Sequence, residues 1–595
     1  MLGGLKRWLP PIGSPRYHIM LALVAILILG PLGGVSAAFM NFSIVFFVGG
    51  QVLAGILGSV VTLPYGPEGK HGANYMQTMA ASVAGMCGMA VLIQAMVWLG
   101  LPEPPAWELV LYFTCIGMYG VGLGMLYTPI VVDRMQLSFP SGFAVANILR
   151  ALTDRNLLKR SIAKLGSGMG LGYAVGLGSL KVAFVAATGI SVSTLGAGMI
   201  VGARIALAAL QVALIGHWQM PRLVAMGWLD PGAPYRKIGF VIALGTILGA
   251  ALLDIVLIMI QAARRMREKS AAPEQADWKR VNWIRLILWI LFWGAGTAIV
   301  GSQILHQPLF FLAIALLLSL AFVLINGISV GISDSNPISS AFVVTVFILA
   351  ALGLRDAGVG LMCASILLIA CAEGADMQQD RSTGWRLGTN RVTQFRYQVI
   401  GIATGAVLAV VLAKVFMQAY PILRVDQFNH SHLPAAQHWQ SAMTYKFVGA
   451  LNGITTSQPQ VMKALRFGFL LGLGLEVVRK LLKRWGAWSR FRKGSRTGAV
   501  IEFVVDSLVI PSPYASSFGG FVELPTIFWW TAGGVGGSLY TAWQERRTKG
   551  RRLTGDAALP EDMSTTSLVG GGLIAGDSLA ALTVGIVGLL SSVLG

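Results

Sequence analysis

The sequence has few charged residues, and this shortage excludes a soluble globular protein. Charged side chains make up 12% of the 595 residues, whereas 55% are hydrophobic. Soluble domains carry about 25% charged residues, and a soluble fold could not cover so much apolar surface. The chain is therefore predicted to be a polytopic membrane protein. The 73 glycines agree with this class, because glycine lets membrane helices pack closely.

The sequence also lacks the motifs of several common sites. Its four cysteines lie inside apolar runs without CxxC spacing, which argues against a disulfide framework and a cysteine metal site. Histidines occur in HSHLPAAQH at 430–438 without helical i, i+4 spacing, so no metal is predicted there. No Walker A motif is present, nor the GxGD and YD pair of an intramembrane aspartyl protease. We expect no cofactor, no ATP motor and no enzyme activity.

The net charge of +20 comes from Lys and Arg gathered in short loops between apolar runs. This pattern is typical of cytoplasmic loops in membrane proteins, so no nucleic-acid partner is predicted. The basic segments interpreted as cytoplasmic are the N-terminus, 150–164, 263–285, 381–396, 478–496 and 545–552.

Apolar windows determine the predicted fold class. A helix that crosses about 30 Å of hydrocarbon needs about 20 apolar residues, and about 14 to 17 windows of this kind occur. The fold class is therefore all-α, with broken or re-entrant segments among the spans. Three windows lie between the basic loops 150–164 and 263–285, and an odd number cannot return the chain to the same side. One of these three is predicted to be interrupted, as happens where a helix lines a cavity.

The chain is weakly duplicated. GTILGAALLDIV (245–256) is similar to GLIAGDSLAALT (572–583), and GANYMQTMAAS (72–82) and ISDSNPISSAF (332–342) each begin an apolar run with an Asn-centred polar patch. These similarities predict an N-terminal membrane half, a basic cytoplasmic linker and a C-terminal membrane half, and transporters built in this way bind substrate between their halves. The predicted boundaries are 1–262, 263–285 and 286–595.

Ionisable groups at membrane depth need an explanation, because each costs a few kcal/mol. Arg204 interrupts GMIVGARIALAAL, and its planar fork of donors suits a carboxylate, either of a substrate or of a buried acid. Lys181, Asp254, Glu476 and Asp506 are interpreted as interhelical ion pairs or as side chains that reach the interface.

Prolines with hydroxyl neighbours interrupt three other apolar runs. They occur in LSFPSGFAVANIL (137–149), SDSNPISSAF (333–342) and VDSLVIPSPYASSFGGFVELP (505–525). Proline removes a backbone donor and frees a carbonyl group one turn back. In lipid such groups must find partners or face a substrate pathway, so these segments are candidates for lining the site. A capped loop between spans is the alternative.

The segment AEGADMQQDRSTGWRLGTNRVTQFR (372–396) places acids at the end of an apolar run. Burial there would make the protonation of Glu373, Asp376 and Asp380 switchable, so these three are predicted to couple transport to protons. The arginines at 381, 386, 391 and 396 are interpreted mainly as positive-inside anchors.

These segments together resemble the oligopeptide transporter (OPT) family. Its bacterial members carry a segment like GD-x-x-QD-x-KTG-Y-x-x-G, then a basic stretch and Q-x-x-G. Ala375, Ser382 and Trp385 stand where the family has glycine, lysine and tyrosine. GLIAGDSLAALTVGI resembles the last-span motif of the family, and GANYMQT resembles an early one. The positions that match the long segment are Asp376, Gln379, Asp380, Thr383, Gly384, Gln398 and Gly401.

The resemblance implies about 16 transmembrane helices in two related halves and secondary active transport in the bacterial inner membrane. We predict a proton-coupled importer of short oligopeptides or peptide-like metal chelates. A passive channel and a polytopic enzyme acting on lipid or peptide are the alternatives, and a homo-oligomer is left open. The predicted substrate-binding residues are Asn74, Gln77, Pro140, Ser141, Arg204, Asn336, Pro337 and Asp577.

Overall fold

The computed structural model describes most of the chain. It covers 9–43, 51–153, 155–181, 192–250 apart from 234, 236, 240 and 244, residues 252, 253 and 257, 276–333, 336–427, 439, 441–452, 459–494, 496–521, 524–548 and 564–594. Asp254, the histidine segment 430–438 and most of the predicted linker 263–285 lie outside these residues. The division into two halves stays a prediction.

Every regular element of the described residues is helical, and no strand occurs among them. The elements up to residue 225 are α2 (Pro15–Val24), η1 (Ala25–Leu29), α3 (Gly30–Ser43), α4 (Gln51–Thr62), η2 (Leu63–Glu68), α5 (Gly69–Gly88), α6 (Ala90–Trp98), α7 (Ala106–Thr128), η3 (Pro129–Arg134), α8 (Pro140–Thr153), α9 (Arg155–Lys181), α11 (Val192–Val201) and α12 (Ala203–Ala225).

The later elements include the longest helix of the described residues, α17. They are η4 (Asp277–Lys279), α14 (Trp283–Ile299), η5 (Val300–Ile304), α15 (Leu309–Ser333), α16 (Ile338–Ala351), α17 (Ala357–Leu387), α18 (Arg391–Ala419), η6 (Pro421–Arg424), α19 (Ala442–Asn452), α20 (Pro459–Arg484), α21 (Gly486–Gly494), α22 (Arg496–Val504), η8 (Val505–Val509), α23 (Pro513–Phe521), α24 (Leu524–Thr548) and α25 (Thr565–Leu594).

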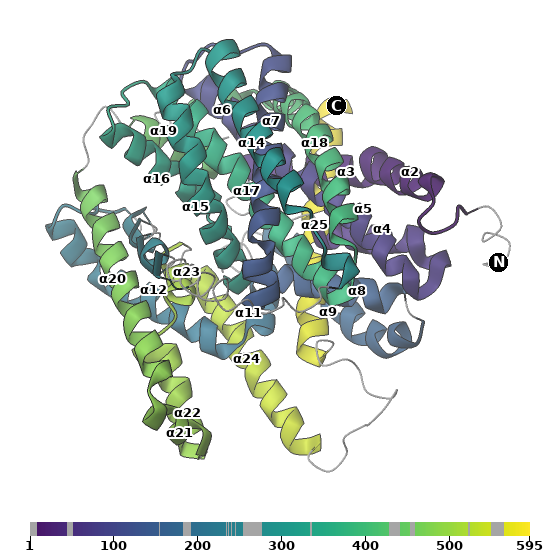
Figure 1. The fold of residues 1–595 in the computed structure, drawn as a ribbon, viewed down its shortest axis with the longest axis vertical. Coiled ribbons are helices and arrows are strands. Elements are labelled where there is room, and N and C mark those ends of the chain that lie inside the picture. The colour runs from purple at the N-terminus through teal and green to yellow at the C-terminus, as the bar shows by residue number, and fades with distance from the viewer. Residues whose placement is uncertain are drawn as a thin grey trace.

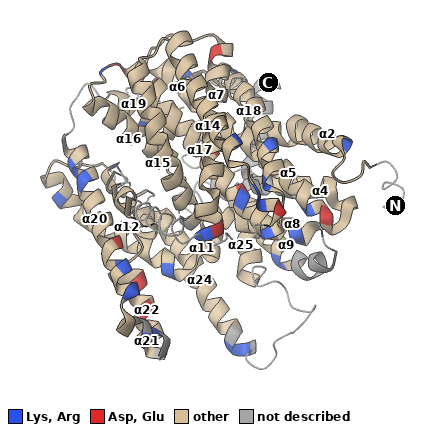
Figure 2. Cartoon of the chain, viewed as in Figure 1, with Lys and Arg blue, Asp and Glu red and all other residues tan. Residues whose placement is uncertain are grey.

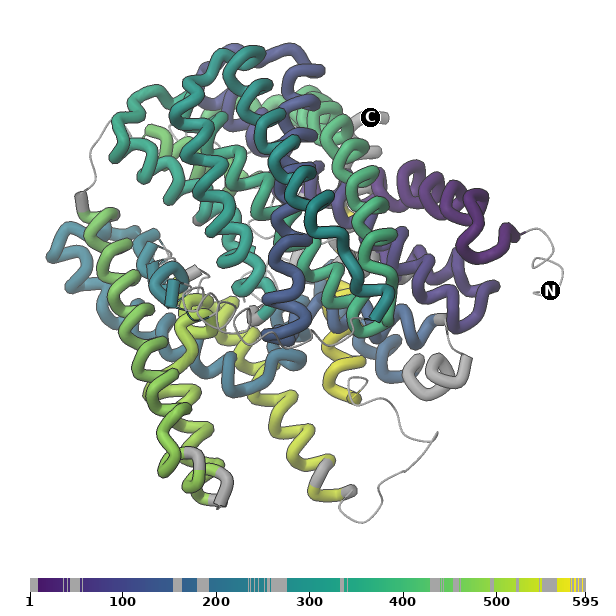
Figure 3. Tube along the Cα trace, in the orientation of Figure 1, coloured from purple at the N-terminus to yellow at the C-terminus, as the bar shows by residue number. Residues whose placement is uncertain are grey.

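The predicted class, an all-α polytopic membrane protein, is confirmed. Among the described residues seven helices are long and apolar enough to cross a membrane, or up to eight if a bent pair is one span. The total of about 16 spans stays a prediction. Figure 2 shows Lys and Arg on α20 and few charges on α15 and α16. Figure 3 traces α20 and α24 as arms that extend away from the main bundle.

Helices α5 and α17 are central, whereas α14 faces outward. The apolar windows of the spans Leu57–Trp98 and Ala357–Leu387 are 94% and 83% buried, but that of Asp277–Ile304 is only 33% buried. Helices α7, α15, α16, α5 and α8 pack on α17 (Figure 1). On α14, apolar residues at helical spacing from Ile284 to Phe292 are exposed, as expected of a lipid-facing helix.

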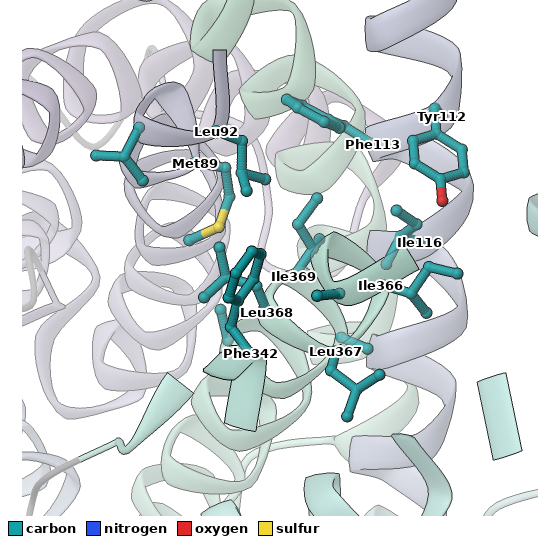
Figure 4. Packing of buried hydrophobic residues seen from close by; sticks show 14 of the residues in the cluster. Met89, Leu92, Tyr112, Phe113, Ile116, Phe342, Ile366, Leu367, Leu368 and Ile369 are labelled. Atoms are coloured by element: carbon teal, nitrogen blue, oxygen red, sulfur yellow. The ribbon is translucent and has the colours of Figure 1, made fainter. Parts of the chain in front are cut away.

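The first half of α17 is packed in apolar side chains. Figure 4 shows Ile366 and Leu368 among Leu92, Phe113 and Phe342 of the surrounding helices, and all five are buried. Polar contacts in this half involve its backbone, as where the Tyr112 hydroxyl donates to the Met362 carbonyl oxygen at 3.0 Å. Polar side chains in the second half of α17 must therefore find their partners on other helices.

Small residues let α7 and α17 touch through their backbones. A Cβ atom on Gly120 would lie 2.6 Å from the Cα of Ala370, and one on Gly124 would lie 2.5 Å from the Gly374 carbonyl oxygen. Both helices thus carry small residues four positions apart at the contact, which is a recurrent way for membrane helices to approach closely.

The segment 381–396, predicted to be a loop, is mostly helical, and its place on the cytoplasmic side stays a prediction. Helix α17 continues to Leu387 and ends at Gly388, whose φ of +73° is accessible to glycine. The Asn390 side chain then caps α18 by accepting a hydrogen bond from the Thr393 backbone N–H at 2.9 Å. The charges at Asp380 and Arg381 indicated a solvent-exposed loop, but both side chains are buried by neighbouring helices.

Helices are interrupted at the predicted places. Gly202, with φ +86° and ψ 169°, separates α11 from α12 and breaks the predicted span 195–217. Helix α8 begins at Pro140 and α16 directly follows Pro337. Farther on, Thr497–Val509 and Pro513–Gly520 meet at an angle of 44°. These breaks agree with the predicted broken or re-entrant segments.

Candidate functional site: a polar cluster on α5, α17 and α18

Buried amide, hydroxyl and carboxyl groups of α5, α17 and α18 meet inside the bundle. The Gln77 amide donates to Oδ1 of Asp380 at 2.6 Å. The Gln394 amide nitrogen lies 2.9 Å from the Thr78 hydroxyl, 3.3 Å from Oδ1 of Asn74 and 2.8 Å from the Asp380 carbonyl oxygen. All five residues are buried. The predicted residues Asn74, Gln77 and Asp380 therefore belong to one network.

Two further predicted acids lie beside this network. A Cβ atom on Gly85 of α5 would lie 2.9 Å from Oε1 of Glu373 and 3.3 Å from Oδ2 of Asp376, so both carboxyl groups approach the same glycine. Glu373 is fully buried, and neither of its carboxyl oxygens has a hydrogen-bond partner among the described residues. The side chains of Ser82 and Gln398 face this carboxyl group. The pair provides a buried place where a proton can be held.

Helical periodicity explains why these groups converge. Residues 373, 376 and 380 are spaced i, i+3, i+7 and share one face of α17, while 74, 78 and 82 share one face of α5. Thr78, Ser82, Gln394 and Gln398 were missed as site residues. The sequence did carry a signal for them, because Thr78 and Ser82 on α5, and Gln394 and Gln398 on α18, are each spaced i, i+4 within an apolar helix.

The segment around Pro140 packs on the far end of α17. The Thr383 hydroxyl donates to the Gly142 carbonyl oxygen at 2.9 Å. Pro140 is buried and Ser141 is half-buried just before that glycine. Phe139, with φ +43°, places its backbone N–H 2.8 Å from the Gly331 carbonyl oxygen at the end of α15. An unusual backbone conformation thus holds the start of α8 between α15 and α17.

The segment around Pro337 also contacts α17, one helical turn from the acids. The Asn336 amide donates to the Cys371 carbonyl oxygen at 3.3 Å, and its own oxygen accepts from Asn326 at 2.9 Å. Pro337 follows directly and is buried. Both predicted proline segments therefore border the helix that carries the acids.

The structure does not bring Arg204 and Asp577 to this cluster. Nη1 of Arg204 lies 3.3 Å from Oδ2 of Asp506, and the Arg204 side chain is 50% exposed. The sequence suggested either a substrate carboxylate or a buried acid as the partner of Arg204, and in the structure the partner is the protein's own Asp506. Asp577 lies on α25, where its carboxyl group accepts from the Ser193 backbone N–H at 3.3 Å and approaches Gly176 of α9.

The arginines near the cluster differ in their surroundings. Arg391 forms a two-pronged pair with Asp133 at 3.0 and 2.8 Å, and Lys279 lies 3.7 Å from the same acid. Arg386 donates to the Ser138 carbonyl oxygen at 2.9 Å. Arg381 is 1% exposed, and none of its three guanidinium nitrogens has a hydrogen-bond partner among the described residues. Arg381 is therefore an interior group, whereas the sequence indicated an anchor at the membrane surface.

Asp133→Asn is expected to lower the free energy of unfolding by about 2 kcal/mol, because it leaves buried Arg391 without its counter-charge. The effect stays below that of a fully buried pair since the Asp133 side chain is 20% exposed. The midpoint of thermal unfolding of the purified protein measures it. Asp230→Asn, in an ion pair whose side chains are 61% and 75% exposed, is the matched control and should leave the midpoint unchanged. Equal midpoints for both variants would contradict the structural role of the Asp133 pair.

The chemistry of the cluster suits a polar organic solute. No three His, Cys, Asp or Glu side chains in the described part of the chain are arranged to hold a metal ion. The cluster offers amide donors and acceptors, hydroxyl groups and carboxyl groups instead. These groups can hydrogen-bond a solute rich in amides and charged ends.

A profile of the family described as OPT oligopeptide transporter protein matches residues 17–587, which include every helix of the cluster. The chain belongs to the OPT oligopeptide transporter family. This confirms the resemblance noted in the sequence and makes the chain an integral, multi-pass membrane protein of a family that transports oligopeptides. No curated protein matches the chain.

Proposed function

We propose that this OPT protein is a proton-coupled secondary transporter that imports short oligopeptides or peptide-like metal chelates across a bacterial inner membrane. The observation that carries the proposal is the buried polar cluster on α5, α17 and α18. Groups of this kind are expensive at membrane depth, where intramembrane ionisable residues typically mark a transport pathway. Membership of a transporter family agrees with this interpretation.

The amide side chains of the cluster are proposed to hold the substrate. Asn74 and Gln77 present donors and acceptors that match peptide groups, and they exchange their present partners for the solute when the site opens. The segments at Pro140–Ser141 and Asn336–Pro337 border α17 and are proposed to frame the same pathway. Substrate contacts by Arg204 and Asp577 remain predictions, which require those residues to approach the cluster in another conformation.

The acids are proposed to carry the proton. A carboxyl group that alternates between packed protein and water changes its proton affinity, since burial and neighbouring charge act on it only in the packed state. The groups that face Glu373 are Asp376, Asp380, Ser82 and Gln398, with Cys87 of α5 also near. Protonation of this carboxyl can then be linked to the state that the helices adopt.

Uptake by proteoliposomes tests this function. Vesicles containing the purified protein are given an equimolar mixture of di- to pentapeptides, with and without a gradient of one pH unit. For one proton per solute, this gradient permits an accumulation ratio of about 10, because a factor of ten corresponds to about 1.4 kcal/mol. We expect accumulation above the external concentration only with the gradient, and its loss on adding a protonophore. Uptake that stops at equal concentrations with the gradient imposed would identify a passive channel.

A further inference from the structure

Arg381 is a buried cation without hydrogen-bond partners. Its side chain is 1% exposed, and all three guanidinium nitrogens lack a partner among the described residues. Arginine keeps its charge in proteins, so it cannot reduce this cost by losing a proton. A buried charge without adequate partners destabilises the state that contains it. The arrangement therefore favours a ligand that supplies acceptors in some state of the protein.

The charges around Arg381 are of both signs. The neighbouring Asp380 is of opposite charge, but its Oδ1 accepts from Gln77 at 2.6 Å and its Oδ2 has no hydrogen-bond partner among the described residues. Arg391 of α18 acts on Arg381 as a like charge. Because Asp133 is already paired with Arg391, that acid does not supply acceptors to Arg381.

We propose that Arg381 binds the carboxylate of the transported solute through its paired guanidinium donors. The inference rests on the proposed function, because it assigns one group of the same transport site. Two parallel N–H donors match the two oxygens of a carboxylate, which a lysine ammonium cannot do. Binding the solute would supply the acceptors that Arg381 lacks in the present structure.

The test is a ligand-induced thermal shift of the full-length protein in detergent. The ligands are an equimolar mixture of free-acid di- to pentapeptides, the same mixture with C-terminal amides, citrate, and a short-chain phosphatidylglycerol. Arg381→Gln removes the charge, and Arg381→Lys keeps the charge but removes the paired, planar guanidinium donors. Arg396→Gln, at an exposed position of α18, is the matched control.

We expect the free acids to raise the midpoint of wild type and of Arg396→Gln, and the amidated peptides to raise neither. Arg381→Gln should weaken apparent binding of the free acids at least about tenfold, and Arg381→Lys should fall between it and wild type. Because Arg381 and the neighbouring Asp380 are buried opposite charges, each shift is measured against the ligand-free midpoint of the same variant.

Three results overturn the inference: no shift of wild type by any free acid or citrate, an undiminished shift in Arg381→Gln, or an Arg381-dependent shift by phosphatidylglycerol alone. Peptide uptake by the same preparations separates this inference from the proposed function. If free acids and amides enter equally and Arg381→Gln does not change uptake, the transport function is supported and the carboxylate site is contradicted. If no peptide enters but carboxylates still shift the midpoint through Arg381, the carboxylate site is supported and peptide import is contradicted.

Discussion

Replacing Glu373 by glutamine should reduce the peptide accumulation ratio under a gradient of one pH unit from about 10 to about 1. The amide has nearly the shape of the carboxyl group but cannot exchange a proton at neutral pH. Because the carboxyl oxygens of Glu373 have no hydrogen-bond partner among the described residues, the change should disturb packing little. Exchange of labelled for unlabelled peptide across vesicles without a gradient should persist, since it needs no net proton movement.

The matched control is Glu476→Gln on α20. Glu476 is also buried, at 3% exposure, but it is paired with Arg479 at 3.2 Å and Lys480 at 3.5 Å. Its carboxyl group therefore has a structural role, and Glu476→Gln should accumulate peptide as wild type does. Accumulation by Glu373→Gln at the wild-type ratio would show that the proton is carried elsewhere.

Gly124→Leu should lower the free energy of unfolding by at least about 3 kcal/mol, at the upper end of the usual effect of overpacking. A Cβ at this position would lie 2.5 Å from the Gly374 carbonyl oxygen and 2.8 Å from Cβ of Met377. The first contact is with backbone, which cannot rotate away, so α7 and α17 must separate. The midpoint of thermal unfolding and the yield of folded protein in detergent measure this change.

Gly170→Leu on α9 is the control for this prediction. A Cβ at Gly170 meets no atom within 4 Å, so the added side chain projects into open space. Its midpoint should stay close to that of wild type. Similar losses in both variants would contradict the close contact of α7 with α17. Because α17 carries the acids, Gly124→Leu should also impair transport in whatever fraction remains folded.

The sequence predicted the fold class, the helix breaks and most of the residues that gather around α17. The apolar windows determined the class, and prolines marked several breaks because their backbone chemistry is local. The odd number of windows between two basic loops indicated the break in which Gly202 lies. Glu373, Asp376 and Asp380 could be placed on one side of the structure because helical spacing alone puts them on one face. None of these inferences required knowledge of distant contacts.

The sequence was not sufficient where contacts between distant segments determine the environment of a side chain. Arg381 follows several polar residues, and a sequence cannot distinguish a wet loop from a helix whose charges are covered by α5 and α18. For Arg204 the sequence left open a substrate carboxylate or a buried acid, because its partner Asp506 is about 300 residues away and could not be recognised from spacing. Gln394 and Gln398 were overlooked because their i, i+4 spacing alone does not show which polar groups on other helices they contact.

Solvent access to Ser82 during transport tests the central claim most directly, since Ser82 is fully buried beside Glu373. With the four native cysteines replaced by alanine, Ser82→Cys is treated with a membrane-impermeant thiol reagent in proteoliposomes. Ser365→Cys, in the apolar half of α17, serves as the buried control. We predict labelling of Ser82→Cys during peptide exchange and none of Ser365→Cys. If Ser82→Cys stays unlabelled throughout exchange, the cluster on α5, α17 and α18 is not the transport pathway.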